Sequence, residues 1–221
     1  MGAYLILGAG KFGRLALARL RERDPAARFV IVDKNRAALE ALPSSPEDRV
    51  AAIEADVATF LREQLANYAS WDWLVPMVPV HVALLSLQEA PQADNWELME
   101  VPQEVEIIAP VAIRGSRGEV YLSRAKHICP DDCPSPADFC PVTGESRTPA
   151  LYEELAALKL PGFRVMVIPS RQLAPGVGGY SPKELMDLPD AIADGLDNLL
   201  IATACRCHGV VHALRRRQGS A

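Results

Sequence analysis

The chain begins with Ala3-Tyr-Leu-Ile-Leu-Gly-Ala-Gly-Lys-Phe-Gly13, an apolar run that leads directly into a glycine-rich loop. The run predicts a buried strand at 3–7, and the residues after the loop have the apolar spacing of a helix at 11–23. A strand, a glycine turn and a helix in this order are typical of the first unit of a parallel α/β sheet. This stretch therefore decides the fold that we expect for the first half.

The same alternation continues along the first half of the chain. Further strands are predicted at 28–33, 50–53 and 73–78, with helices at 35–42 and 57–68. Strand and helix alternating four times favours a parallel sheet with helices on its faces. The expected fold class is α/β, with a doubly wound parallel sheet and a smaller α+β C-terminal region that carries the cysteines.

The second half has a different pattern. We expect strands at 104–113, 118–124 and 163–168, a helix at 152–158, a flexible turn at 175–179 and one long helix at 190–217. A polar segment near residues 90–103 is bracketed by Ala90-Pro91 and Val101-Pro102. We therefore expect two domains, at residues 1–95 and 96–221.

The glycine loop has the spacing G-x-G-x-x-G, formed by Gly8, Gly10 and Gly13, and Asp33 ends the next predicted strand. The first glycine permits the tight turn, the second lets a pyrophosphate approach the backbone, and the third allows close helix–sheet packing. A helix N-terminus then offers free N–H groups to phosphates. Asp33 would accept hydrogen bonds from a ribose diol and repel a 2′-phosphate, which favours NAD over NADP. Two basic residues close to Asp33, Lys34 and Arg36, leave NADP open.

Three segments of the first half resemble a known family. Gly8-Ala-Gly-Lys-Phe-Gly13, Asp33-Lys-Asn35 and Glu54-Ala-Asp56-Val are similar to the NAD-binding regulatory domains of bacterial potassium uptake, the TrkA N-terminal or KTN/RCK type. The similarity covers roughly residues 1–90. It implies a Rossmann fold, NAD(H) or another adenine nucleotide as ligand, and a homodimer. The residues that it implies as nucleotide-binding are Gly8, Gly10, Lys11, Phe12, Gly13, Asp33 and Asp56.

The resemblance has limits in the residues themselves. Ala55 stands where the family usually has glycine, and Pro76 and Pro79 are unusual in its fourth strand. The second half does not resemble the family's regulatory C-terminal domain. The similarity therefore supports nucleotide binding better than it supports potassium transport.

Composition and charge exclude several classes of function. The 221 residues include 23 basic and 28 acidic side chains, a net charge of −5, which disfavours nucleic-acid binding. The longest apolar stretch, 74–87, contains Pro76, Pro79 and His81 and is too short to span a bilayer. No secretion signal is expected at the N-terminus, so we predict a cytoplasmic protein that is not membrane-inserted and has reduced thiols.

The five cysteines divide into two groups, three on a proline-rich loop and two near the C-terminus. Within a helix at 190–217, Cys205, His208 and His212 would share a face and Cys207 would point away. Two metal sites are then possible. Zinc would use Cys-x₃-Cys with His-x₃-His. An iron–sulfur cluster would use the three loop thiolates, with Cys205 or Cys207 as the fourth. A third interpretation is that the thiols fill space and bind nothing. The candidate metal ligands are Cys129, Cys133, Cys140, Cys205, His208 and His212.

These features predict an NAD(H)-binding protein that acts as a nucleotide sensor or regulatory subunit, with a zinc or iron–sulfur site in the C-terminal region. Its partner would be a membrane transporter or a redox protein. The alternative is an NAD-dependent oxidoreductase with a cysteine or metal centre, in which His81 or His208 handles protons. A structural zinc module is a third possibility. The catalytic residues and the substrate of such an enzyme stay unknown from the sequence.

Overall fold

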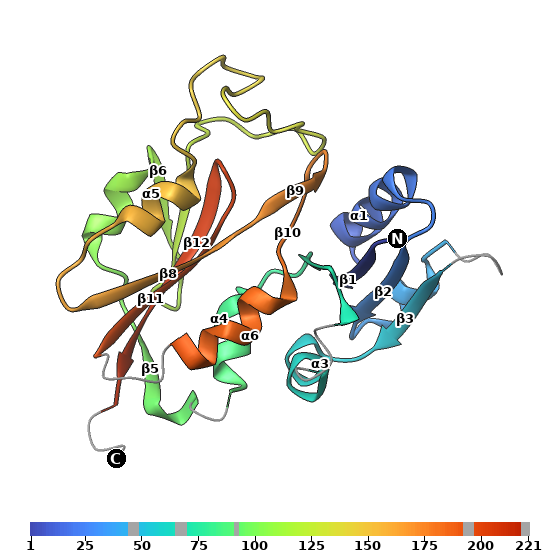
Figure 1. Ribbon diagram of the computed structural model, residues 1–221, viewed down its shortest axis with the longest axis horizontal. Helices are drawn as coiled ribbons and strands as arrows, with labels where there is room; N and C mark the ends of the chain where they lie inside the picture. The colour runs from blue at the N-terminus through green and yellow to red at the C-terminus, as the bar shows by residue number, and fades with distance from the viewer. Residues whose placement is uncertain (44–48, 65–69, 91–92, 192–196, 218–221) are drawn as a thin grey trace.

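The computed structural model describes residues 1–43, 49–64, 70–90, 93–191 and 197–217. In this part of the chain the structure is mixed α/β, with a parallel sheet from the first half and a second, larger sheet from the second half. Figure 1 shows the two sheets side by side, with helices α4 and α6 between them. The expected α/β class is confirmed at this level.

The first sheet contains four parallel strands in the order β3-β2-β1-β4. All four coincide with predicted strands, apart from one or two residues at the ends. A helix precedes each strand after the first and returns the chain to the end of the sheet at which the strands begin. Parallel strands require such a crossover connection. The bounds are β1 Ala3–Leu7, β2 Arg28–Asp33, β3 Val50–Glu54 and β4 Trp73–Pro76.

Helices cover both faces of this sheet. Helices α1 (Lys11–Arg23) and α2 (Arg36–Glu40) pack in a core with alternate strand residues such as Ile6 and Ile31. Helices α3 (Val57–Gln64) and α4 (Val82–Gln88) pack in the core on the opposite side chains, Leu5, Leu7, Val30 and Val32. Successive residues of a strand point to opposite faces, so these continuous apolar runs follow from burial on both sides. The end of the helix predicted at 57–68 lies outside the described residues.

The second sheet has six strands and is built around a long hairpin of β11 (Asn198–Ala204) and β12 (His208–Arg216). The order is β6-β7-β12-β11-β8, and β5 pairs with the distal half of β12. Among the described strands of this sheet, only β8 and β11 are parallel neighbours. The other bounds are β5 Trp96–Met99, β6 Val111–Arg114, β7 Val120–Ser123 and β8 Phe163–Pro169. This region is therefore not the smaller part that we expected.

The hairpin strand β11 separates two layers of helices. Leu200 and Ala202 face α5 (Leu151–Ala157), whereas Leu199 and Ile201 belong to the core that contains α4 and α6 (Pro182–Ala191). That second core also contains Leu5, Leu7 and Leu74 of the first sheet. The two sheets are thus joined by shared apolar packing, and the domain boundary at residues 95/96 stays a prediction.

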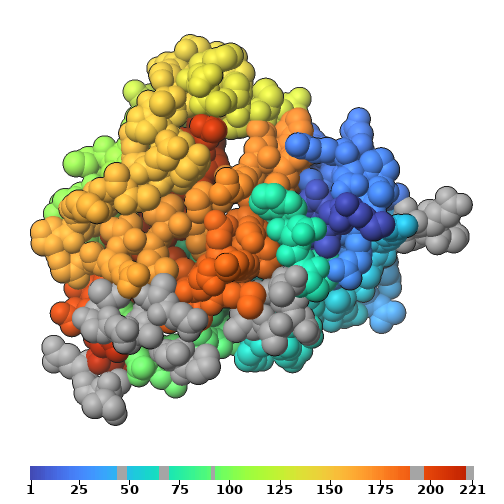
Figure 2. Space-filling model, in the orientation of Figure 1, coloured from blue at the N-terminus to red at the C-terminus, as the bar shows by residue number. Residues whose placement is uncertain are grey.

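A short hairpin brings the second half against the first. Strands β9 (Arg171–Ala174) and β10 (Val177–Gly179) pair with each other, and Tyr180 then pairs with Leu74 of β4. The two Leu74–Tyr180 backbone hydrogen bonds are 2.9 and 3.0 Å long. In Figure 2 the orange segment that contains this hairpin lies against the blue N-terminal segment.

Two predictions for the second half are wrong. The expected helix at 190–217 is the β11–β12 hairpin, and α6 lies before it, because pairing with β8, β7 and β5 buries an apolar run that also suits a helix. The expected strand at 104–113 begins only at Val111, after a 3₁₀ segment at Gln103–Ile108 and Pro110, which has no N–H to donate.

The turn expected at 175–179 is present but shorter. It covers residues 175 and 176, and strand β10 begins at Val177. A 3₁₀ turn that was not predicted covers Ala93–Asn95.

Candidate functional site: a glycine loop beside a thiol-lined cavity

The glycine loop joins β1 to α1 in the geometry that the sequence predicts. Gly8 has φ +107° and its N–H donates to the Val32 carbonyl at 2.7 Å. A Cβ on Gly13 would lie 1.9 Å from the Gly8 carbonyl oxygen, so the helix approaches the loop more closely than any side chain allows. A Cβ on Gly10 would meet nothing within 4 Å. The second glycine therefore leaves open space at the start of the helix.

Asp33 is fixed at the end of β2 beside this loop. Its carboxylate accepts hydrogen bonds from the Ala9 N–H at 2.7 Å and from the Asn35 N–H at 2.8 Å. Asp56, at the equivalent end of β3, accepts from the N–H groups of Ala58 and Thr59 and so caps α3. Both carboxylates lie at the carboxyl edge of the parallel sheet, where open α/β sheets bind ligands.

Lys11 and Phe12, in the first turn of α1, connect the glycine loop to the second half of the chain. The Lys11 ammonium lies 2.8 Å from the Asp131 carboxylate, and Arg19 of the same helix donates to the Asp131 carbonyl at 2.7 Å. Phe12 is half exposed and lines a cavity of about 500 Å³. The loop that contains the predicted cysteine ligands therefore docks on the helix of the glycine loop.

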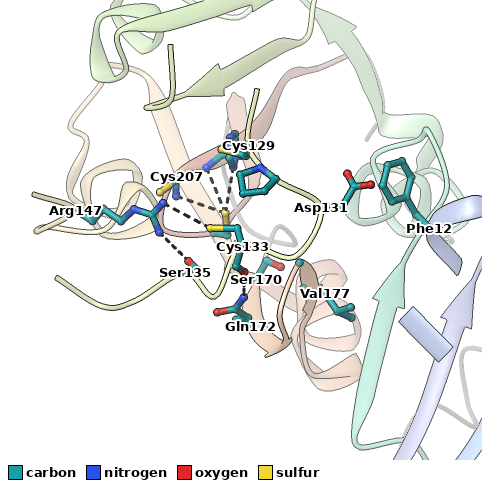
Figure 3. A pocket seen from close by; sticks show the side chains of 15 residues that line it. Phe12, Cys129, Asp131, Cys133, Ser135, Arg147, Ser170, Gln172, Val177 and Cys207 are labelled. Atoms are coloured by element: carbon teal, nitrogen blue, oxygen red, sulfur yellow. Dashed lines mark hydrogen bonds between the residues drawn. The ribbon is translucent and has the colours of Figure 1, made fainter. Parts of the chain in front are cut away.

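This cavity is formed by the cysteine loop, the β11–β12 turn and the β9–β10 hairpin. Figure 3 shows Phe12 and Asp131 at one end and the thiols with Arg147 at the other. Its lining residues are Phe12, Cys129, Pro130, Asp131, Cys133, Ser135, Arg147, Ser170, Gln172, Gly176, Val177, Gly178, Cys205, Cys207 and His208.

His208 lies between two of the thiols. Its Nε2 is 3.7 Å from Cys129 Sγ, and its Nδ1 is 3.9 Å from Cys205 Sγ. Cys205 Sγ also accepts from the backbone N–H groups of Cys207 at 3.5 Å and His208 at 3.3 Å. Cys207, which the helical prediction turned away, lines the same cavity because the segment is a tight turn between two strands.

The electrostatic environment differs among these thiols. Burial raises the pKa of Cys129, and the neighbouring thiols of Cys133, Cys140 and Cys205 raise it further. Burial and the Cys205 thiolate raise the pKa of Cys207 to about 11, against the lowering effect of Arg147. In Cys205, burial is outweighed by the hydrogen bonds from His208 and the turn, which lower its pKa. The turn thus stabilises a thiolate at Cys205, whereas the raised pKa values of Cys129 and Cys207 disfavour a second negative charge at these two thiols.

Arg147 is a buried cation at the thiol end of the cavity. The residue is 4% exposed, and its guanidinium donates to Ser135 Oγ at 3.2 Å and to Cys133 Sγ at 4.0 Å. Its Nε has no hydrogen-bond partner, and in the described part of the chain it forms no ion pair with a carboxylate. A buried guanidinium needs compensating negative charge, and here the nearest candidates are thiolates.

Cys140 and His212 do not line the cavity. Burial raises the pKa of Cys140, but hydrogen bonds from Thr143, Val142 and Arg147 lower it to about 6 overall. His212 lies four residues along β12 from His208, and its Nδ1 is 2.9 Å from Nδ1 of His81. The prediction that Cys205, His208 and His212 share a helical face is wrong, because the segment is a hairpin.

His81 follows β4, as expected, but its ring is packed inside the protein. It stacks on the His212 ring with centroids 5.0 Å apart, and its Nε2 is 2.9 Å from Thr203 Oγ1. Burial and the His212 charge lower its pKa to about 3, and burial lowers that of His212 to about 4 despite nearby Glu119. Both rings are therefore neutral near pH 7, and neither contacts the cavity.

Among the described residues, no group of three or more histidine, cysteine, aspartate or glutamate side chains is arranged around one metal ion. The same part of the chain contains no helix with the length and apolar character needed to cross a membrane.

Sequence reasoning missed several members of the site. Arg147, Ser135, Gln172 and Asp131 carry no recognisable spacing, because they converge only through tertiary contacts. Cys207 was predicted only as an alternative to Cys205 in an iron–sulfur cluster, because a helix would turn it away from Cys205 and His208.

These features define a mixed α/β protein in which a glycine loop adjoins a thiol-lined cavity. Residues 70–217 match the family model AF_1314_C, described as the C-terminal domain of an uncharacterized protein, and the chain belongs to this family. An uncharacterized protein of Archaeoglobus fulgidus is 32% identical over 220 residues, covering 96% of this chain and 99% of its own length. No solved structure matches the chain.

Proposed function

We propose that this chain binds NAD(H) across the glycine loop of a Rossmann-like, doubly wound first half and acts as a nucleotide sensor or regulatory subunit. The observation that carries the proposal is the combination of an open position at Gly10, close packing at Gly13 and a fixed carboxylate at Asp33. These are the three features that a pyrophosphate, a helix and a ribose diol each require. From the family resemblance, Asp56 and Lys11 would also contact the nucleotide.

The KTN/RCK resemblance adds the regulatory role to this proposal. A sensor of this kind would be a cytoplasmic homodimer that reports nucleotide state to a membrane transporter or a redox protein. The docking of the cysteine loop on Lys11 and Arg19 supports such coupling, because a ligand at the start of α1 would meet the same lysine that holds Asp131.

Calorimetric titration of the full chain with NADH, NADPH and ADP-ribose tests the proposal. We expect NADH to bind, NADPH to bind at least about tenfold more weakly, and Asp33→Asn to weaken NADH binding by about 10–100-fold, the range for a lost hydrogen bond to a charged group. Asp72→Asn is the matched control, because the Asp72 carboxylate accepts the N–H of Ala3 at the start of β1, at the end of the sheet opposite to Asp33. Absence of binding by all three compounds would refute the proposal.

The alternative function, an NAD-dependent oxidoreductase, is favoured by one observation. Phe12 of the glycine-loop helix and four cysteines line the same cavity, so a nucleotide and a reactive group at the thiols would be neighbours. Consumption of NADH in the presence of artificial electron acceptors, lost in Cys→Ser variants of the cavity, would select this function over the sensor.

A further inference from the structure

Four of the five cysteines line one cavity, although they come from two distant segments. Cys129 and Cys133 lie on the loop between β7 and α5, and Cys205 and Cys207 lie in the β11–β12 turn. Figure 3 shows Cys129, Cys133 and Cys207 gathered at the same end of the cavity. Two Cys pairs that are distant in the sequence therefore line the same cavity.

Backbone contacts hold both pairs in place. The Cys133 carbonyl accepts from Gln172 Nε2 at 2.6 Å and from the Gly176 N–H at 3.0 Å. The second pair is set by a tight turn, in which the Cys205 N–H donates to the His208 carbonyl at 2.8 Å. The backbone at Cys133 and at Cys205 is thus held by the hairpins around the cavity.

The arrangement of the ligand side chains argues against a single ion. Among the described residues, no group of three or more His, Cys, Asp or Glu side chains surrounds one ion, and His208 turns different nitrogens toward Cys129 and Cys205. Four Cys side chains on one open cavity supply the ligand type and number of a cluster of several metal ions and sulfides.

The polar surroundings match an anionic, thiolate-bound group. Arg147 brings a buried positive charge to the thiols without a carboxylate partner in the described residues. Backbone N–H groups of Cys207 and His208 point at Cys205 Sγ. Hydrogen bonds to ligating sulfurs are the contacts by which proteins stabilise iron–sulfur clusters and set their potentials.

We propose that Cys129, Cys133, Cys205 and Cys207 ligate one [4Fe–4S] cluster in this cavity, with Arg147 as a positioning residue that balances its charge. Cys140 is not a ligand, because it does not line the cavity and its sulfur is held by its own turn and by Arg147. His212 is not a ligand, because it pairs with His81. This proposal is independent of nucleotide binding.

The test is anaerobic reconstitution of the full chain with ferrous iron and sulfide, without nucleotide. We expect about four iron and four sulfide per chain, a brown protein, and a paramagnetic signal after reduction with dithionite. Single Cys→Ser substitutions at the four ligand positions should lose at least about half of the bound iron. Cys140→Ser, the matched control from the same loop, should retain it.

Arg147 provides a second measurement with a readout that a purely structural role does not move. Arg147→Lys keeps the positive charge and should keep the cluster, whereas Arg147→Met should shift its reduction potential downward, because the cluster loses a neighbouring cation. Far-UV circular dichroism checks that each variant is folded before loading.

Three results would overturn the assignment. These are one zinc per chain in place of iron and sulfide, full iron retention in the four ligand variants, and loss of the cluster in Cys140→Ser but not in Cys207→Ser. Failure of the NADH titration would leave this result unaffected, so the two proposals can fail separately.

Discussion

Substitution of Gly13 by alanine tests whether the close approach of α1 to the glycine loop is essential. A Cβ at this position would lie 1.9 Å from the Gly8 carbonyl oxygen, and real Cβ atoms keep at least 3.0 Å, so helix and loop must separate by about 1.1 Å. Both contacting groups belong to backbone, and neither can rotate away. Overpacking of this kind costs up to about 3 kcal/mol.

Part of that cost is offset by helix propensity. Alanine is favoured over glycine inside a helix by up to about 1 kcal/mol, which leaves a net destabilisation of about 2 kcal/mol. In a chain of this length 1 kcal/mol corresponds to roughly 2–4 °C, so the melting temperature should fall by roughly 4–8 °C. Thermal unfolding followed by circular dichroism measures this shift.

Gly10→Ala is the matched control in the same loop. Its Cβ would meet no atom within 4 Å, and alanine is less favourable than glycine at an N-cap by roughly 0.5–1 kcal/mol. We expect its melting temperature to fall by about 4 °C at most. Its NADH affinity should fall because the Cβ occupies the open approach to the backbone. If Gly13→Ala melts with the wild type, the close-packing argument is wrong.

Three further predictions follow from individual contacts. Lys11→Met and Asp131→Asn should each change the free energy of unfolding by less than about 0.5 kcal/mol, because their side chains are 69% and 48% exposed. A double-mutant cycle should show a coupling energy that weakens with salt. Strong, salt-independent coupling would contradict this expectation. Gly176→Ala should increase cleavage of the 128–149 loop in limited proteolysis, since its Cβ would lie 1.7 Å from the Asp131 carbonyl oxygen. Gly144→Ala should not, because Gly144 has a similar positive φ but open space around its Cβ position. Equal cleavage in both variants would show that backbone strain at positive φ matters and the clash does not. The free energy of unfolding should fall as pH drops from about 6.5 toward 4, because His81 and His212 stay neutral in the folded state while the unfolded chain takes up protons. Each histidine contributes up to about 1.4 kcal/mol per pH unit to this fall. Denaturant titrations at several pH values measure the fall, and His212→Gln should reduce the slope of the free energy of unfolding against pH.

The first half of the fold could be predicted because its signals are local. Apolar runs, periodicity and flanking glycine or proline predict two strands and a helix, and the structure has them with the same bounds: Ala3–Leu7, Arg28–Asp33 and Lys11–Arg23. A parallel strand buried on both faces carries its own apolar signature, so little tertiary information is needed. The open Gly10 and the packed Gly13 also follow from the spacing of the loop.

The second half could not be predicted in the same way. The run Asn198–Ala204 is apolar enough for a helix or a strand, and only its pairing with β8 and β12 decides between them. The wrong choice placed His212 with the thiols and turned Cys207 away from them. The predicted helix at 190–217 also begins too late to include α6, which therefore was not predicted.

The sequence by itself determined the α/β class, the four parallel strands, the geometry of the glycine loop and the residue types available for a thiolate site. Only the tertiary structure decided which of those residues meet. It brought Cys207 and Arg147 to Cys129 and Cys133, removed His212 to a buried pair with His81, and docked the cysteine loop on the glycine-loop helix. The reason is physical: short-range propensities are encoded in neighbouring residues, whereas the cavity exists because strands far apart in sequence pair and bury their apolar faces together.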